Sequence, residues 1–143
     1  MRKILQLTLL LLLVSTLGCS RKGKDIPPPR LGDLEVQFKV TDPYNRLGNY
    51  LPIPVNIAIY DDSLHACEIR SQRVTTNPDE VQLVEFKDIE ARTSYYYLEI
   101  KIDYHSALDA SCNDYMVFIE EGKVRRIGLI VMEYNYQGVD CTP

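Results

Sequence analysis

The longest regularly alternating stretch of the sequence is YYYLEIKIDY, at residues 95–104. Its apolar and aromatic side chains, which include Tyr96 and Ile100, fall on every second position. Acidic and basic side chains such as Glu99 and Lys101 stand between them. A period of two is typical of a β-strand with one buried face and one solvent-facing side. We therefore expect this stretch to form the strand on which the rest of the domain is organised.

Shorter stretches of the same kind recur along the chain. They predict six further strands, at residues 34–40, 55–60, 73–76, 81–89, 115–120 and 124–134. The strand at 81–89 changes phase at Leu83-Val84, which suggests a β-bulge there. No stretch has the spacing of a helix of useful length. Seven short strands predict a single all-β domain, a seven-stranded Greek-key β-sandwich.

The charge balance of the chain argues against one class of partner. The 143 residues include 16 basic and 20 acidic side chains, which gives a formal net charge of −4. The first 18 residues contribute Arg2 and Lys3 and no acid, so the remainder is more acidic still. Neutralisation of phosphates dominates nucleic-acid binding, and a mildly acidic domain without a basic stripe cannot supply it. We expect no nucleic-acid partner.

The N-terminus has the three parts of a secretory signal peptide. Arg2 and Lys3 are positively charged, residues 4–14 are almost wholly apolar, and small residues precede Cys19. The apolar run is much shorter than the roughly 20 residues that a transmembrane helix needs. We therefore assign residues 1–18 to a signal peptide. An uncleaved anchor helix is the alternative interpretation.

The end of this segment, Leu17-Gly18-Cys19, resembles the lipobox of bacterial lipoproteins, in which cleavage before the cysteine is followed by its lipidation. Thr16 departs from the pattern, which usually has leucine three residues before the cysteine. The resemblance implies that Cys19 is the acylation site and that a lipid anchor holds the protein in a membrane. Residues 19–33 then form a tether, whose consecutive prolines at 27–29 favour an extended chain.

The charges of the tether also indicate on which side of the outer membrane the domain lies. Some surface-exposed lipoproteins have acidic residues just after the lipidated cysteine, whereas Arg21, Lys22 and Lys24 are basic. We therefore expect an outer-membrane anchor with the globular domain, residues 34–143, on the periplasmic side.

Within that domain, three signals follow one another in a recognisable order. They are Thr75-Thr76-Asn77, the apolar positions Val84, Phe86 and Ile89, and the tyrosine-rich strand from residue 95 to 98. Over residues 34–132 this order resembles a prealbumin-like domain of the carboxypeptidase regulatory-like and Cna-B-like type, which is common in Bacteroidota envelope lipoproteins. The usual turn glycine is absent, and Pro78-Asp79-Glu80 stands in its place. The resemblance implies a transthyretin-like sandwich and says little about function.

Three cysteines, Cys67, Cys112 and Cys141, remain beyond Cys19. Secreted domains tend to pair their cysteines, and three leave one over. If the strands alternate in direction, the loop with Cys112 and the tail with Cys141 share one end of the sandwich, and Cys67 lies at the other. A disulfide needs Cα atoms within about 7 Å of each other. We therefore predict a Cys112–Cys141 disulfide and an unpaired Cys67.

One predicted loop contains Asp61, Asp62, His65 and Cys67, whose side chains are of types that bind zinc. Their spacing matches no standard zinc site, so we interpret the loop as solvated and expect no metal and no other cofactor. The two histidines, His65 and His105, would lie at opposite ends of the sandwich. There is also no Gly-x-Ser-x-Gly motif. We expect no catalytic residues and no enzymatic activity.

Four tyrosines form the candidate binding surface in the sequence. Tyr95 and Tyr97 are expected on the outer side of the central strand, and Tyr134 and Tyr136 on the last one. Exposed aromatic patches mark binding sites more often than chance, although some tyrosines simply line the core. The chain is thus expected to be an anchored, non-catalytic accessory or adaptor domain for another envelope protein. A glycan-binding module that uses the tyrosines and a pilin-like structural subunit are the alternatives.

Replacing Cys19 with Ser should release the protein into the soluble fraction or leave the signal peptide uncleaved, because no thiol remains to be acylated. Mass spectrometry of the mature wild-type N-terminus checks this, and it should find a lipid-modified Cys19 as the first residue. An unmodified first residue other than Cys19 would contradict the prediction.

Overall fold

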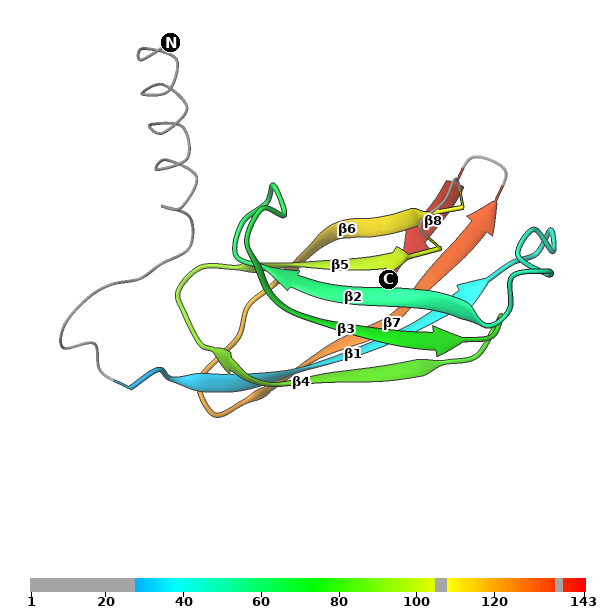
Figure 1. The fold of residues 1–143 in the computed structure, drawn as a ribbon. Coiled ribbons are helices and arrows are strands. Elements are labelled where there is room, and N and C mark those ends of the chain that lie inside the picture. Colours follow the sequence, from blue (N-terminus) through cyan, green and yellow to red (C-terminus); the bar gives the residue numbers. More distant parts are fainter. Residues whose placement is uncertain (1–27, 105–107, 136–137) are drawn as a thin grey trace, which may run out of the picture.

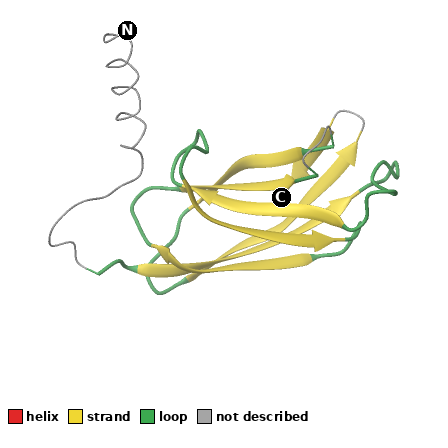
Figure 2. Ribbon diagram, in the orientation of Figure 1, coloured by secondary structure: helices red, strands yellow, loops and turns green. Residues whose placement is uncertain are grey.

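The computed structural model describes residues 28–104, 108–135 and 138–143 (Figure 1). The predicted signal peptide, the lipidation site Cys19 and most of the tether lie outside these residues. The described chain consists of strands and loops, as Figure 2 shows. These residues include no helical segment that could span a membrane.

The described residues contain eight strands. These are β1 (Leu31–Thr41), β2 (Ile53–Tyr60), β3 (Glu68–Thr76), β4 (Gln82–Glu90), β5 (Tyr96–Ile102), β6 (Ala110–Val117), β7 (Val124–Asn135) and β8 (Gly138–Thr142). They form two four-stranded sheets, with the orders β4-β1-β7-β8 and β3-β2-β5-β6. The two sheets face each other as a sandwich (Figure 1). The prediction of an all-β sandwich is confirmed, but the predicted number of seven strands is wrong because β8 was not expected.

Strand β1 lies inside the first sheet, with β4 antiparallel on one side and β7 parallel on the other. Every second side chain of β1 points into the core. These inward side chains, none of which has exposed surface, are Leu34, Val36, Phe38 and Val40. In the second sheet, β5 pairs with β2 and β6 and shows the alternation expected from the sequence. Its buried side chains are Tyr96, Leu98, Ile100 and Ile102.

One end of the core is covered by Arg92, in the link between β4 and β5. Its guanidinium lies 3.7 Å from the centre of the Tyr96 ring, a cation–π geometry. The same guanidinium forms an ion pair with Asp61 and donates a hydrogen bond of 2.8 Å to the carbonyl of Tyr95. The Tyr96 hydroxyl donates to the carbonyl of Glu90 at 2.7 Å, so this buried polar group is satisfied.

The β-bulge predicted in β4 is present, but at another place. The pairing of β4 with β1 shifts between Gly32 and Leu34, and not opposite Leu83-Val84. Asp88 lies at this shift and has a positive φ of 55°. The extra residue restores the inward phase, because Ile89 then points into the core and is buried.

Strands β3 and β6 begin well before the residues predicted for them, at Glu68 and Ala110 in place of residues 73 and 115. Both are edge strands of the second sheet. Edge strands tend to be polar and irregular, so their sequences lack a clean alternation. Strand β1 also begins earlier, at Leu31, so that residues 31–33 of the predicted tether belong to the sheet.

On one long side of the sandwich, side chains from β3 cover the edge of β4. Gln72 donates from Nε2 to the carbonyl of Glu85 at 2.5 Å, and Arg70 donates to the carbonyl of Lys87. Backbone carbonyls that an edge strand would otherwise offer to another chain are therefore occupied.

The opposite long side is closed over part of its length by a disulfide between Cys112 and Cys141, whose Cα atoms are 5.9 Å apart. The predicted pairing is confirmed. The cysteines lie in β6 and β8, however, so the bond joins the edge strands of the two sheets. The disulfide is not all that holds the tail, because β8 pairs with β7 from Val131 to Asn135. Cys67 is also disulfide-bonded, with neither of these as its partner, so the prediction of an unpaired Cys67 is wrong.

Replacing Cys112 and Cys141 together with Ala should lower the free energy of unfolding by roughly 3–4 kcal/mol, because the closed loop of the unfolded chain is lost. Urea denaturation of the folded variant measures this difference. The double variant leaves no odd thiol to pair with Cys67. Reduced wild-type protein also loses the disulfide of Cys67 and should therefore be destabilised at least as much. Equal stability of variant and wild type would show that β8 is held by its pairing with β7 alone.

Candidate functional site

The four predicted tyrosines do not form one surface. Tyr134 is in the core, 3% exposed, and its hydroxyl donates to the carbonyl of Leu108 at 3.1 Å. Its placement on the outer surface was therefore wrong, and Tyr136 lies outside the described residues. Tyr95 is outward and 53% exposed, and Tyr97 is half-buried in β5.

A register shift explains the burial of Tyr134. The pairing of β7 with β1 skips Gly128, so β7 has a bulge at that residue. From there on, alternate residues of β7 point inward, and Met132 is buried together with Tyr134. An aromatic side chain in this phase contributes to the core, and its hydroxyl needs the partner that Leu108 supplies.

The predicted solvated loop, residues 61–67, is stabilised by hydrogen bonds between the Asp62 side chain and the backbone of the loop. The Asp62 carboxylate accepts hydrogen bonds from the N–H groups of Ala66, Cys67 and Leu64 at 3.2, 2.9 and 2.9 Å. These bonds, that from Ala66 first, hold the pKa of Asp62 below its ordinary value. The His65 ring stacks on the Tyr60 ring, and the two ring centres are 4.6 Å apart. No group of His, Cys, Asp and Glu side chains suited to a metal occurs among the described residues, and His105 is outside them.

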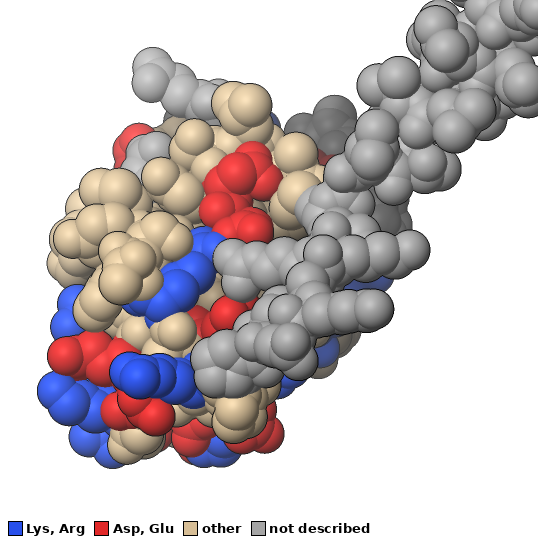
Figure 3. Space-filling model, turned by 90° about the vertical axis from the view of Figure 1, so that its left-hand side faces the viewer, with Lys and Arg blue, Asp and Glu red and all other residues tan. Residues whose placement is uncertain are grey.

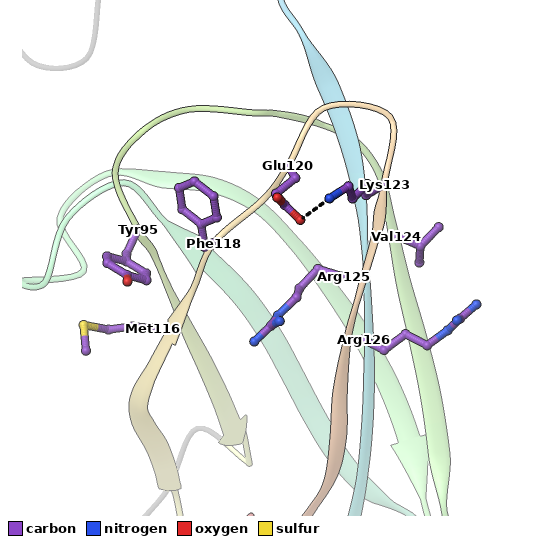
Figure 4. Close-up of a pocket in the computed structure, with 8 residues that line it drawn as sticks. All are labelled: Tyr95, Met116, Phe118, Glu120, Lys123, Val124, Arg125 and Arg126. Atoms are coloured by element: carbon purple, nitrogen blue, oxygen red, sulfur yellow. Dashed lines mark hydrogen bonds and ion pairs between the residues drawn. The ribbon is translucent and has the colours of Figure 1, made fainter.

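A surface groove opens instead between β6 and β7 (Figure 4). It has a volume of about 340 Å³. We call it the β6–β7 groove and define it by the residues that line it, which are Tyr95, Met116, Phe118, Glu120, Lys123, Val124, Arg125 and Arg126.

Large apolar side chains occupy one side of the groove. Met116 is 61% exposed, Phe118 is 38% exposed, and the Tyr95 ring meets the Phe118 ring edge to face at 5.9 Å. The alternation of β6 explains them, since Val117 and Ile119 point into the core and leave their neighbours outside. Exposed apolar groups that lie together mark an interaction site more often than singly scattered ones do.

Basic side chains occupy the other side. Lys123 pairs with Glu120 at 3.0 Å, and Arg126 pairs with Glu35 at 2.7 Å. For Arg125 there is no ion-pair partner among the described residues. Figure 4 shows its side chain extending from β7 toward Met116, whereas Arg126 points away. Elsewhere at this end of the sandwich, acidic and basic side chains are interspersed (Figure 3).

The groove lies beside a strand edge that no other strand covers. Strand β8 pairs with β7 only from Val131 onward, so within the described chain the first part of β7, up to Ile130, is paired on one side alone. Figure 1 shows β8 next to the far end of β7. Along an uncovered edge, alternate N–H and C=O groups point away from the sheet.

Sequence reasoning missed Met116, Phe118 and Arg125 as site residues. A signal was present for the apolar pair, because residues 115–119 are apolar or aromatic throughout and only every second one can face the core. The basic run at residues 123–126 follows after a short turn. That these two segments line one groove depends on how β6 and β7 lie in different sheets, which no local pattern reveals.

The phenol of Tyr60, next to the loop at 61–67, donates to the Glu99 carboxylate at 3.0 Å. Burial, together with the negative charge of Glu99, raises the pKa of Tyr60 to about 12. A raised pKa favours the neutral phenol in the folded state. Its contribution to stability is therefore complete below pH about 10 and is lost as the pH rises toward about 12.

An ultraviolet absorbance titration checks this. Replacing Tyr60 with Phe should remove an ionisation step near pH 12. Replacing Glu99 with Gln should move that step toward lower pH. Persistence of the step near pH 12 in the Phe variant would contradict the assignment.

No protein-family model matches the chain, and no curated protein matches it either. A search of solved structures matches Serratia marcescens Lip, described as a membrane-bound component of the Type VI secretion system. The two chains share 10% sequence identity with a TM-score of 0.42, over 79% of this chain and 97% of Lip. A similarity this distant supports no conclusion about function, so the function has to be argued from the groove itself.

Proposed function

We propose that this protein is a lipid-anchored envelope domain that acts without catalysis, as an adaptor that binds another envelope protein through the β6–β7 groove. The observation that carries the proposal is the exposure of Tyr95, Met116 and Phe118 beside Arg125, which has no ion-pair partner in the described part of the chain. Aromatic residues, methionine and arginine are the side chains enriched at protein interfaces. Because they lie together in one hollow, a partner can cover all of them at once.

The fold is proposed to be prealbumin-like. After the β2–β3 hairpin in one sheet, the chain returns as β4 to lie beside β1 in the other. A returning strand of this kind is the feature that defines a Greek key. The fold alone assigns no activity, which is why the proposal depends on the groove.

The position of the tether adds to the proposal. The start of β1 is bound to the turn between β6 and β7, through hydrogen bonds from Gly122 N to the Leu31 carbonyl at 2.8 Å and from Asp33 N to the Lys123 carbonyl at 2.9 Å. The tether therefore enters the domain at the same end as the groove. With a lipid on Cys19, an extended tether of roughly 3 Å per residue would place the groove toward the membrane.

The anchor makes one demand on the cysteines. The sulfur of Cys19 cannot carry an acyl-glycerol thioether and also form a disulfide with Cys67. If Cys19 is lipidated, the disulfide of Cys67 must therefore form with a thiol outside this chain, because Cys112 and Cys141 pair with each other. Peptide mapping of the mature protein under non-reducing conditions should then find no Cys19–Cys67 link. Such a link would contradict the lipid anchor and leave the proposal for the groove intact.

The burial of Tyr134 weakens the glycan-binding alternative, because one of the four tyrosines predicted for that surface is in the core. At the groove itself, Tyr95 and Phe118 pack edge to face. Their faces are therefore not aligned as a single flat platform for a sugar ring.

Site-specific photo-crosslinking of the full chain in intact cells tests the proposed function. A crosslinker at Met116 should yield an adduct with one discrete envelope protein. The matched control is Ile69, which is 45% exposed and lies on β3, at the opposite edge of the second sheet from β6. The same adducts from both positions, or none from Met116, would overturn the proposal.

Stability measurements accompany this test. Replacing Phe118 with Ala should lower the free energy of unfolding by about 1 kcal/mol, because the side chain is 38% exposed and loses its edge-to-face contact with Tyr95. Replacing its neighbour Ile119, which is buried, should cost about 2 kcal/mol or more. A lost adduct in the Phe118 variant then reports on binding and not on folding.

A further inference from the structure

We infer that the partner enters the groove as an extended acidic segment that adds a strand to the uncovered edge of β7, at Val124–Ile127. The inference rests on the proposed function and specifies how the partner binds. Strand addition to a free sheet edge obtains its affinity from main-chain hydrogen bonds and its specificity from the side chains on either side.

Two other stretches along the long sides of the sandwich are already covered. Side chains of Arg70 and Gln72 bind carbonyls along the edge of β4. Strand β8 covers β7 from Val131 onward, and the Cys112–Cys141 disulfide holds β8 to β6. The first part of β7 has neither kind of cover among the described residues.

The bulge at Gly128 sets the length of the usable edge. A bulge twists the strand and interrupts a regular ladder. An added strand can therefore pair continuously from Val124 to Ile127, beside the β6–β7 groove, and would have to break its register beyond that point.

Charges and apolar contacts at this edge define the occupant. Arg125 pairs in register with the buried Leu34, so it lies on the core side of the sheet, and its side chain extends into the groove. A carboxylate on the added strand would neutralise it. Because side chains of a strand alternate, the residue two positions away would point into the same groove and lie against Met116 or Phe118. The occupant is thus an extended segment with an acid and an apolar residue two positions apart.

The same charges argue against two other occupants. A second copy of the chain would bring its own Arg125 and Arg126 against these residues, and like charges directly opposite each other are destabilising. The chain's own tether has one acid, Asp25, after the basic residues Arg21, Lys22 and Lys24, and the prolines at 27–29 that follow it cannot donate hydrogen bonds to a strand ladder. Neither therefore offers Arg125 an extended acidic strand.

The test uses the full mature chain and a synthetic peptide, acetyl-Ser-Glu-Thr-Val-Thr-Leu-Ser-amide, at millimolar concentration. Hydrogen exchange measured by NMR should show added protection of at least one backbone amide within Val124–Ile127. A peptide with Lys in place of Glu should protect these amides on the order of tenfold less. Two peptide analogues, each N-methylated at every second amide in one of the two possible alternations, distinguish strand addition from binding by side chains alone. In strand addition, the analogue whose methyl groups replace the N–H groups that pair with β7 should lose binding. Binding by side chains alone would tolerate both analogues.

Charge exchange provides the matched variant. In an Arg125→Glu protein, the acidic peptide should bind on the order of tenfold more weakly and the Lys peptide correspondingly better. The control is Lys39→Glu, which makes the same change in net charge at the other end of β1 and should leave both affinities unchanged. If both variants behave alike, the effect is general electrostatics and the inference is wrong.

Every remaining result decides the inference. Protection of β7 amides that rises with protein concentration and without peptide would assign the edge to a second copy. Protection by an oligosaccharide in place of the peptide would assign the groove to glycans. A Met116 adduct without any protection of β7 by the acidic peptide would keep the proposed function and reject strand addition.

Discussion

The fold depends on the parallel pairing of β1 with β7. Antiparallel neighbours can be joined by a tight turn, but parallel neighbours need a long crossover. Here the whole chain from β2 to β6 makes that crossover, so the first sheet closes only when the two ends of the domain meet. Once β7 lies against β1, its other edge is free. How much of that edge becomes covered is decided by where β8 turns back.

The two long sides of the sandwich are therefore closed by different contacts. Between β3 and β4, side chains reach across and bind backbone carbonyls. Between β6 and β7, a disulfide and a short strand cover one half and leave the other half open. An open edge is a liability when its side chains are apolar, and charges such as Arg125 and Arg126 reduce that liability. Charges alone would suffice for protection, so the exposed Met116 and Phe118 beside them call for a further explanation, which a bound partner provides.

The sequence was sufficient where burial alone determines the pattern. The central strand at residues 95–104 and the strand that became β1 alternate because one side faces the core, and both were located from that alternation. It was insufficient where the structure depends on pairing between segments that are distant in the sequence. Strand β8 has no period of its own and forms because β7 offers an edge to it. Whether the Tyr134 side chain points outward or into the core depends on the bulge at Gly128, which the sequence alone did not reveal. The groove combines residues of β6 and β7, whose relation exists only in the folded sandwich.

The stability of the domain and its proposed binding are linked through β7. A strand that must bind an extended segment loses affinity if the strand itself has to be ordered at that moment. The first part of β7 is already paired with β1, and its second part is held between β1 and β8, which the disulfide joins to the other sheet. The start of β1 is in turn bound to the turn that leads into β7. The uncovered edge is thus the free side of a strand fixed at both ends, and a partner would bear only the cost of its own ordering.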